Sequence, residues 1–399
     1  MTPYQRRLIL FLSVATFFEG YDFFAMSQIL PSLRAEFGLS RAGAGWLVAA
    51  INSGTMIAAL LVRKADAWGR RRVLTVTIVG YTLCSLASAA APDVYSFAGA
   101  QLAARVFLIG EWAIAMVFAA EEFPAARRGL VIGVIQACSS LGSIVCAGVV
   151  PLIDKTAIGW RLVFLVGAVP LIIVAVARRG LRETERFERT GGVRRPFVEV
   201  LRSPYRRRIL QMALIWCITY VATQNGITFW KEFAMHERGF TDGQVGLSLS
   251  IAAVVSMPLV FLSGRLLDGI GRRRGAVVIF TVTALGIFLA YTLHSRVALT
   301  LALILGIFGS SAVLPVMNAY TTELFPTELR GDAFAWANNV LGRLGYVLSP
   351  IGVGLIAERT GWGPVLAWTA VCPLVALGLI LALLPETRGR ELEDTSRLG

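Results

Sequence analysis

Two acidic side chains, Glu19 and Asp22, interrupt a strongly apolar segment near the start of the chain, RLILFLSVATFFEGYDFFAMSQILP. In a helix, residues three apart lie on one face, roughly 4.5 Å apart along the axis. Two carboxylates so close in a medium of low dielectric repel each other, which favours a bound proton on at least one of them. The pair could therefore carry a proton.

Three further charged residues, Arg105, Glu111 and Arg343, also lie inside apolar segments. A charge in the middle of a bilayer costs at least about 2.5–3.5 kcal/mol, so it normally faces a cavity or a partner. We expect Asp22 to alternate between a bound proton and Arg105 as partner, and we assign proton coupling to Glu19, Asp22 and Arg105. The alternative is a fixed ion pair among these three groups that only holds two helices together.

The composition places these charges in a membrane protein. The chain has 399 residues, of which 56% are hydrophobic and 16% charged, and its mean hydropathy is +0.68. Soluble domains are about a quarter charged. Most apolar runs reach the roughly 17–25 residues that span a bilayer as a helix. Twelve such spans are predicted, at about 8–30, 44–62, 73–91, 97–120, 130–153, 161–177, 209–230, 245–264, 276–293, 297–319, 332–357 and 363–384.

The net charge of +13 is concentrated in every second loop and at the termini. This distribution follows the positive-inside rule and predicts that both termini and the central basic loop are cytoplasmic. It argues against nucleic acid as a partner. The first span is predicted to be uncleaved, because acids interrupt it and no small-residue cleavage site follows. The five cysteines lack paired spacing, so we expect no disulfide framework, metal or cofactor.

An internal repeat organises the chain. DAWGRRR at 66–72 matches DGIGRRR at 268–274, and EEFPAARRG at 121–129 matches ELFPTELRG at 323–331. Both pairs have the same spacing, 202 residues (268 − 66 and 323 − 121). The repeat predicts two six-helix bundles, 1–186 and 209–399, joined by a basic cytoplasmic linker, 187–208. Parallel repeats of this kind place a substrate site between the halves, near the midplane of the membrane.

These motifs resemble those of the major facilitator superfamily. The stretch Gly264–Arg273 is similar to the loop motif of that family, whereas the first copy has Val62 in place of the usual glycine. Both copies lack the usual basic residue after the aspartate, with Ala67 and Gly269 there. The resemblance covers nearly the whole chain and implies an all-α membrane protein with twelve transmembrane helices in two pseudo-symmetric bundles.

Other stretches resemble particular branches of that superfamily. Glu19–Phe24 is similar to the acidic first-span motif of the metabolite:proton and aromatic acid:proton symporters. Arg105 with Gly110–Trp112, and the linker stretch Pro196–Arg202, are similar to the same branches. Pro385–Arg390 looks like the ending of sugar porters and aromatic-acid porters.

Substrate recognition is expected mainly in the second half, where most mid-span polar groups are neutral. Arg343 suggests an anionic substrate, because a guanidinium can hold a carboxylate through two parallel hydrogen bonds. Alternatively, Arg343 points to a helix end or pairs with Glu111, and the amides serve as hydrogen bonds between helices. The predicted substrate-binding residues are Glu111, Gln136, Gln224, Asn225, Asn318, Asn338, Asn339, Arg343 and Tyr346.

The resemblance also implies clusters of opposite charge at the cytoplasmic helix ends, which close that side when the site faces outward. Topology control by positive charge alone is the other interpretation. The gating residues so predicted are Asp66, Arg70, Arg71, Glu121, Arg128, Asp268, Arg272, Arg273, Glu323, Arg330 and Glu386.

The sequence therefore predicts a secondary transporter that imports a small organic acid or related metabolite together with protons. We expect a monomer in a bacterial plasma membrane. A proton-driven exporter of drugs or metabolites, and a sugar or polyol porter, are the alternatives. Signatures of membrane enzymes and of ATP-driven transport are missing from the sequence, and the segment after the last span is short for a signalling sensor.

Overall fold

The computed structural model describes residues 2–388 except 124, 154–155, 178–198 and 327–328. Side chains within the described helices are also left undescribed at a few positions, including Asp66, Glu121 and Arg128. Most of the predicted linker thus lies outside the described residues. In the part that is described, the secondary structure is helical throughout, which confirms the predicted all-α fold class.

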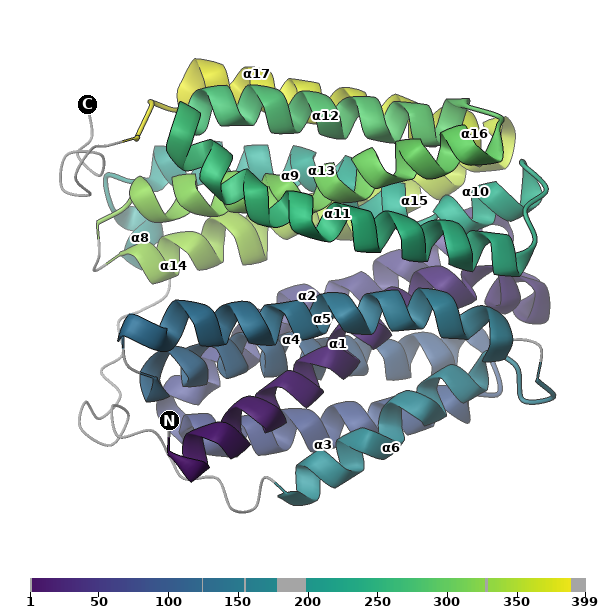
Figure 1. Ribbon diagram of the computed structural model, residues 1–399, viewed down its shortest axis with the longest axis horizontal. Helices are drawn as coiled ribbons and strands as arrows, with labels where there is room; N and C mark the ends of the chain where they lie inside the picture. Colours follow the sequence, from purple (N-terminus) through teal and green to yellow (C-terminus); the bar gives the residue numbers. More distant parts are fainter. Residues whose placement is uncertain (1, 124, 154–155, 178–198, 327–328, 389–399) are drawn as a thin grey trace. The chain divides into compact units, whose positions relative to one another are not determined.

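The first half contains six long helices, shown in purple to teal in Figure 1. They are α1 (Pro3–Phe37), α2 (Arg41–Trp68), α3 (Arg70–Ala89), α4 (Val94–Glu122), α5 (Ala125–Ile153) and α6 (Arg161–Ala177). Helix α1 begins at a capping box in which Thr2 and Gln5 satisfy each other's backbone N–H groups. It ends at Gly38, whose φ of 61° is a conformation that glycine adopts easily.

The second half contains the remaining helices, shown in teal to yellow in Figure 1. They are α8 (Glu199–Arg202), α9 (Arg206–Thr228), α10 (Trp230–His236), α11 (Asp242–Ile270), α12 (Arg272–Thr292), α13 (Arg296–Glu323), α14 (Arg330–Phe334), the π-helix η2 (Ala335–Gly342), α15 (Arg343–Thr360), α16 (Trp362–Thr369) and α17 (Val371–Leu383).

Ten helical segments of the described chain are long and apolar enough to cross a membrane. Helices α6 and α9 lie at two further predicted spans but are not among these ten. Two predicted spans are interrupted. The eleventh contains the π-helix η2, and the twelfth breaks between α16 and α17. Pro373 accounts for the second break, because it has no N–H to donate to the carbonyl of Thr369.

Residue contacts divide the chain into two compact units, here called unit 1 (1–39 and 50–194) and unit 2 (40–49 and 195–399). Within unit 1, α1 packs on α5, and α3 packs on α4 and α6. Within unit 2, α9 packs on η2 and α15, and α12 packs on α13, α16 and α17. The first and fifth predicted spans of each half thus pack on each other, as do the third and fourth and the third and sixth. This correspondence is what a repeat of the two halves predicts.

Helices α1 and α5 approach each other closely where both carry glycine. A Cβ atom at Gly20 would overlap the carbonyl of Ser139, and one at Gly142 would overlap the carbonyl of Phe17. Small residues at such a crossing let two backbones pack by van der Waals contact in the membrane. Because Gly20 lies between Glu19 and Asp22, this crossing fixes the helix face on which both acids project.

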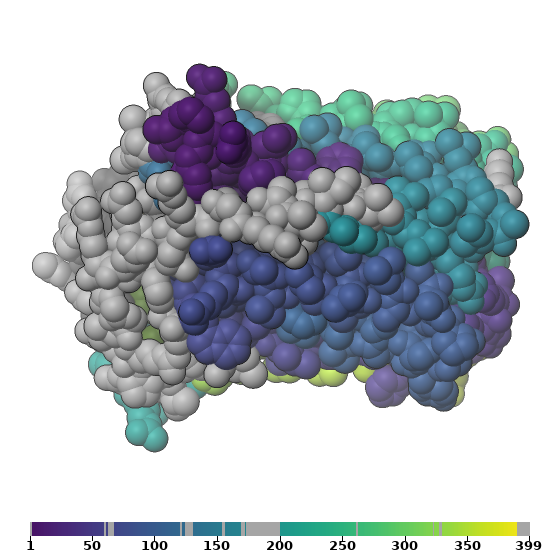
Figure 2. Space-filling view, turned by 90° about the horizontal axis from the view of Figure 1, so that it is seen from below, coloured from purple at the N-terminus to yellow at the C-terminus, as the bar shows by residue number. Residues whose placement is uncertain are grey.

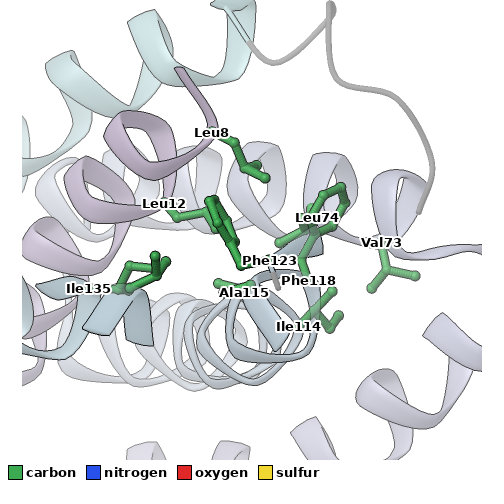
Figure 3. Packing of buried hydrophobic residues seen from close by; sticks show 11 residues of the cluster. Leu8, Leu12, Val73, Leu74, Ile114, Ala115, Phe118, Phe123 and Ile135 are labelled. Atoms are coloured by element: carbon green, nitrogen blue, oxygen red, sulfur yellow. The ribbon is translucent and has the colours of Figure 1, made fainter. Parts of the chain in front are cut away.

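Beside this crossing, unit 1 has an apolar core built from α1, α3, α4 and α5. Figure 3 shows Leu8 and Leu12 of α1 beside Phe118 and Phe123. The whole cluster is Leu8, Leu12, Val73, Leu74, Ile114, Ala115, Phe118, Ala119, Phe123, Val131 and Ile135. Van der Waals contact among these large side chains stabilises the packing and holds α3 and α4 against α1.

The outer faces of the helices are also apolar. Helix α3 belongs to the part of unit 1 drawn in blue in Figure 2. On this helix the exposed residues Val76, Val79 and Leu83 form one stripe at helical spacing. Exposed apolar surface marks a membrane or protein contact. Together with the ten apolar helices, this stripe is typical of helices whose outer faces contact lipid.

Candidate functional site

The two acids of α1 are buried in unit 1. Glu19 is 8% exposed and Asp22 is 6% exposed. Arg105 of α4, which is 4% exposed, lies within electrostatic range of both carboxyl groups. Tyr81 of α3 lies beside Asp22. The structure thus brings together the three residues to which we assigned proton coupling.

Arg105 nevertheless makes no direct ion pair with Glu19 or Asp22 in the described structure. Its guanidinium lies over the ring of Phe23, 4.7 Å from the centroid, and its Nη1 atom has no hydrogen-bond acceptor among the described residues. The Oε2 atom of Glu19 is likewise buried without a hydrogen-bond partner there. The charges are close but are not locked in the fixed ion pair of the alternative interpretation.

Glu111 lies on α4, six residues after Arg105, and faces α3. Its Oε2 atom is 2.5 Å from the hydroxyl of Thr77. Glu111 is 6% exposed, Thr77 is completely buried, and Glu111 lies within electrostatic range of Glu19. Gly110 permits this contact, since its missing side chain leaves the space that the methyl group of Thr77 and Leu61 occupy.

Unit 2 presents a different chemistry, centred on Arg343 at the start of α15. The guanidinium carbon lies 5.0 Å from the ring centroid of Tyr220 and 4.8 Å from that of Tyr346. The two rings are nearly perpendicular, 5.5 Å apart, and Trp216 stacks on Tyr220. Cation–π contacts hold a guanidinium by its face and leave its N–H edge available for an anion.

The π-helix η2 precedes Arg343 directly. Such segments are rare and occur frequently at functional sites, because the extra residue in the turn re-aims the side chains around it. Here Asn338 of η2 accepts a hydrogen bond of 2.7 Å from the hydroxyl of Tyr220. That bond fixes the ring that supports Arg343, so the structure gives Asn338 a positioning contact between helices.

The other polar residues assigned to substrate make varied contacts. Asn225, completely buried, donates to the hydroxyl of Ser349 on α15, 2.7 Å away. Gln224 donates to Thr228 on its own helix, and Gln136 accepts from the indole of Trp112. Asn318 is exposed and Asn339 is half-buried. Asn225, Asn338 and Gln136 therefore make hydrogen bonds between helices.

Five of the predicted gating residues of unit 2 form one connected cluster, namely Asp268, Arg272, Arg273, Glu323 and Glu386. Arg272 bonds to Glu323 at 2.9 Å and to Asp268 at 3.2 Å. Glu386 accepts the backbone N–H groups of Arg272 and Arg273, each at 2.9 Å, and so caps the first turn of α12.

The capping bonds determine the charge state of Glu386. Burial alone would raise the pKa of Glu386, but four backbone N–H groups, including those of Arg272 and Arg273, hold it below its ordinary value. Gly271 precedes this turn with a φ of 94°, where a side chain would be strained and would meet the carboxylate.

The corresponding cluster of unit 1 is only partly described. Arg70 is half-buried and Arg71 is exposed, whereas the side chains of Asp66, Glu121 and Arg128 lie outside the described part. In unit 2, Arg330 donates to the carbonyl of Phe325.

The structure also buries two charges that the sequence interpretation missed. Lys231 is 1% exposed and Glu232 is completely buried, both on α10. Lys231 pairs with Asp242, and His236 lies 3.3 Å from Glu232. The predicted seventh span ends at Trp230, which places these residues in a loop. The apolar Phe233 and Ala234, which continue the helical pattern, were the signal for α10.

The fold is that of a helical membrane protein with several candidate spans and with charged residues buried inside both units. The family model described as the Major Facilitator Superfamily matches residues 12–241 and 225–398. The chain belongs to this superfamily, and it is a transporter rather than an enzyme.

Two sequence relatives and one solved structure agree with this assignment. The chain is 27% identical to a protein of Cupriavidus pinatubonensis described as a 4-methylmuconolactone transporter, over 94% of this chain and 89% of that protein. It is 24% identical to NiaP of Bacillus subtilis, described as a niacin/nicotinamide transporter, over 98% of each chain. The crystal structure of a D-xylose–proton symporter matches the fold with a TM-score of 0.80, at 19% identity, over 97% of this chain and 99% of that one.

Proposed function

We propose that this chain is a proton-coupled symporter that carries a small planar organic acid by alternating access. The observation that supports it is where two groups of charged residues lie. Glu19 and Asp22, the acids to which we assign proton coupling, are buried beside Arg105 in unit 1, and the aromatic-supported Arg343, which could bind an anion, lies in unit 2.

Charge counting supports the proton role of unit 1. Glu19 and Asp22 are both buried, and the guanidinium of Arg105 lies within electrostatic range of both. If both acids were ionised, this one guanidinium would face two carboxylates. Uncompensated buried charges are expensive, and the least costly remedy is to bind protons. Asp22 is the proton carrier we propose, with Arg105 as the group that takes over when the proton leaves.

The chemistry of unit 2 supports an acidic substrate. Arg343 can offer two parallel N–H groups to a carboxylate, while Tyr220 and Tyr346 present ring surfaces to a planar molecule. Two of the relatives transport molecules of this size and shape, according to their names. Those relatives do not favour the exporter or the sugar porter.

We further propose that the protein lies in a bacterial plasma membrane as a monomer, with both termini in the cytoplasm. The distribution of arginines supports this orientation. In it, the cluster of Asp268, Arg272, Glu323 and Glu386 would lie at the cytoplasmic ends of the helices of unit 2. The ion pairs there could form and break as the transporter changes conformation, and the predicted residues of unit 1 would act in the same way.

The test uses purified protein in liposomes and two probes of nearly the same shape, nicotinate and nicotinamide. An inward proton gradient should drive accumulation of labelled nicotinate above its external concentration, and a protonophore should abolish that accumulation. Equal uptake with and without the gradient would contradict proton coupling. Accumulation of nicotinamide but not nicotinate would contradict an anionic substrate.

A further inference from the structure

A pocket of about 540 Å³ opens in unit 2 where α12 begins beside the end of α17. This volume is in the range of small-molecule sites, about 300–1,000 Å³. The pocket combines basic and apolar side chains, a mixture that suits the boundary between a membrane and water. Its main lining residues are the arginines Arg273, Arg274 and Arg388 and the apolar Ile270, Val277 and Leu381.

Two reciprocal contacts hold the walls of this pocket in place. Glu386, just after α17, accepts the backbone N–H groups of Arg272 and Arg273 in the first turn of α12. In return, Nη2 of Arg273 donates to the carbonyl oxygen of Leu381 in the last turn of α17. Helix ends leave such backbone groups without partners in their own helix. Each helix thus satisfies the end of the other, and the pocket is formed before any ligand binds.

The polar groups of the pocket suit a phosphate. Arg274 and Arg388 are exposed, and Arg273 is half-buried between the two helices. The planar fork of a guanidinium matches two oxygen atoms of a phosphate. Glu386 also lines the pocket, but its carboxylate already accepts backbone N–H groups, including that of Arg388. The lining residues therefore offer three guanidinium groups to an anion.

An apolar groove of about 400 Å³ lies farther along the same pair of spans. Leu285 and Phe288 of α12 line one side of it, and Trp368 and Val371 line the other, where α16 meets α17. Figure 1 shows α12 and α17 side by side, and the two helices are in contact. The exposed residue Val277, which also lines the basic pocket, lies between Arg274 and the groove on α12.

The spacing of the pocket and the groove fits one lipid molecule. Leu285 follows Arg274 by eleven residues (285 − 274), which is about 16 Å along a helix. The hydrocarbon region of one leaflet is about 15 Å deep, half of about 30 Å. A lipid whose phosphate lies at Arg274 therefore has its acyl chains at the depth of the groove.

We infer that the seam between α12 and α17 binds an anionic phospholipid. Its phosphodiester contacts Arg273, Arg274 and Arg388, and one acyl chain lies in the groove beside Trp368. A soluble phosphate would use the basic pocket but not the apolar groove, so the two together favour a lipid. In the orientation proposed above, this lipid belongs to the cytoplasmic leaflet, where basic pockets between spans bind anionic headgroups. The inference does not depend on which substrate is transported.

Lipid binding can be measured by native mass spectrometry of the delipidated protein in detergent. The probes are dioleoyl phosphatidylglycerol, which is anionic, and dioleoyl phosphatidylcholine, which has the same chains and no net charge. The wild type should retain the anionic lipid in preference. Each basic side chain near a membrane surface contributes a factor of about five to such binding. The double variant Arg274→Gln/Arg388→Gln should therefore bind phosphatidylglycerol about 30-fold more weakly and phosphatidylcholine unchanged.

Arg207→Gln/Arg265→Gln is the matched control. Both arginines are exposed residues of unit 2 that line neither the pocket nor the groove, so this variant loses the same charge and should bind phosphatidylglycerol like the wild type. Melting temperatures in detergent verify that both double variants are folded. Equal binding of the two lipids by the wild type, or equal losses in the two double variants, would overturn the inference.

Two further measurements separate a lipid from a soluble phosphate. Thr281 is an exposed residue of α12 in the groove, so Thr281→Trp should fill the groove and weaken binding of dioleoyl phosphatidylglycerol. Binding of the dihexanoyl form, whose chains are too short for the groove, should not change. Glycerol phosphate at the same concentration should displace neither lipid. Displacement of the dioleoyl lipid by glycerol phosphate would show a site for soluble phosphates and would refute the lipid site.

Discussion

Replacement of Arg343 by glutamine should convert a transporter selective for anions into one that hardly distinguishes nicotinate from nicotinamide. Arg343 is half-buried at the start of α15, held face-on by Tyr220 and Tyr346. A carboxylate bound to its free edge would gain charge-assisted hydrogen bonds in an environment that water only partly screens. Glutamine keeps a donor at similar length but removes the charge.

The size of the effect follows from the bonds that are lost. Hydrogen bonds to charged groups contribute about 1.5–3 kcal/mol, and each 1.4 kcal/mol is a factor of ten in affinity. Nicotinate should therefore bind about 10- to 100-fold more weakly to Arg343→Gln. Nicotinamide should change much less, because its neutral amide never made the charge-assisted bonds. Arg343→Lys should fall between the two proteins, since lysine keeps the charge and loses the planar fork.

Binding can be measured by thermal shift and by competition with labelled nicotinate, at the pH where accumulation is greatest. Arg296→Gln is the control, because Arg296 is an exposed arginine that also lies over an aromatic ring, that of Phe240, at 5.8 Å. It should affect neither ligand. An equal loss of affinity for nicotinate and nicotinamide in Arg343→Gln would refute the role of Arg343 as the carboxylate ligand.

Three further perturbations test the architecture, two by thermal denaturation in detergent and one by uptake and the yield of folded protein. Glu386→Gln should lower the melting temperature at pH 7. Hydrogen bonds lower the folded-state pKa of Glu386, so its contribution to stability is present above the unfolded pKa, about 4.3, and is lost as pH falls through the folded pKa. The difference in melting temperature between the variant and the wild type should therefore shrink below about pH 4. A difference that grows in acid would contradict the capping role. Gly142→Val should prevent the close packing of α1 on α5, so that uptake is abolished and much less folded protein is obtained. Gly133→Val is the control and should be tolerated, because a Cβ atom at Gly133 meets open space. Equal yields of the two variants would contradict a close contact of α1 and α5 at Gly142. Lys231→Met should destabilise unit 2, because it leaves the half-buried carboxylate of Asp242 without its partner. The additional change Asp242→Asn should recover part of the loss, since it removes that unpaired charge. No recovery would show that the ion pair does not stabilise this part of unit 2.

Much of the fold could be predicted because it depends on patterns along the chain. Apolar length locates the spans, and the two matching motifs reveal the repeat, so the helical class and the superfamily were both correct. The burial of Glu19, Asp22, Arg105 and Glu111 also followed, since a charge within an apolar run must be enclosed.

Contacts between helices could not be predicted in the same way. The sequence suggested Asp22 as the direct partner of Arg105, but the packing of α1 on α4 puts the ring of Phe23 under the guanidinium. The contact between Thr77 and Glu111 depends on Gly110 and on the angle between α3 and α4, which periodicity does not specify.

Local breaks in the helices could not be predicted from the sequence pattern either. The π-helix η2 arises from one extra residue in a turn, which leaves the hydrophobic pattern nearly unchanged. Helix α10 turns away from α9 at Phe229, and the charges of Lys231 and Glu232 then enter the protein interior instead of the surrounding water.

The central claim, that unit 1 carries the coupling proton at Asp22, is tested most directly by Asp22→Asn in liposomes. Two rates are compared for nicotinate, namely accumulation driven by an inward proton gradient and exchange of labelled for unlabelled nicotinate at equal pH. Asp93→Asn, at an exposed cap that asparagine also fills well, is the control for loss of an acid. Our account predicts that Asp22→Asn abolishes accumulation and retains exchange, whereas Asp93→Asn retains both. Gradient-driven accumulation at the wild-type level in Asp22→Asn would contradict it.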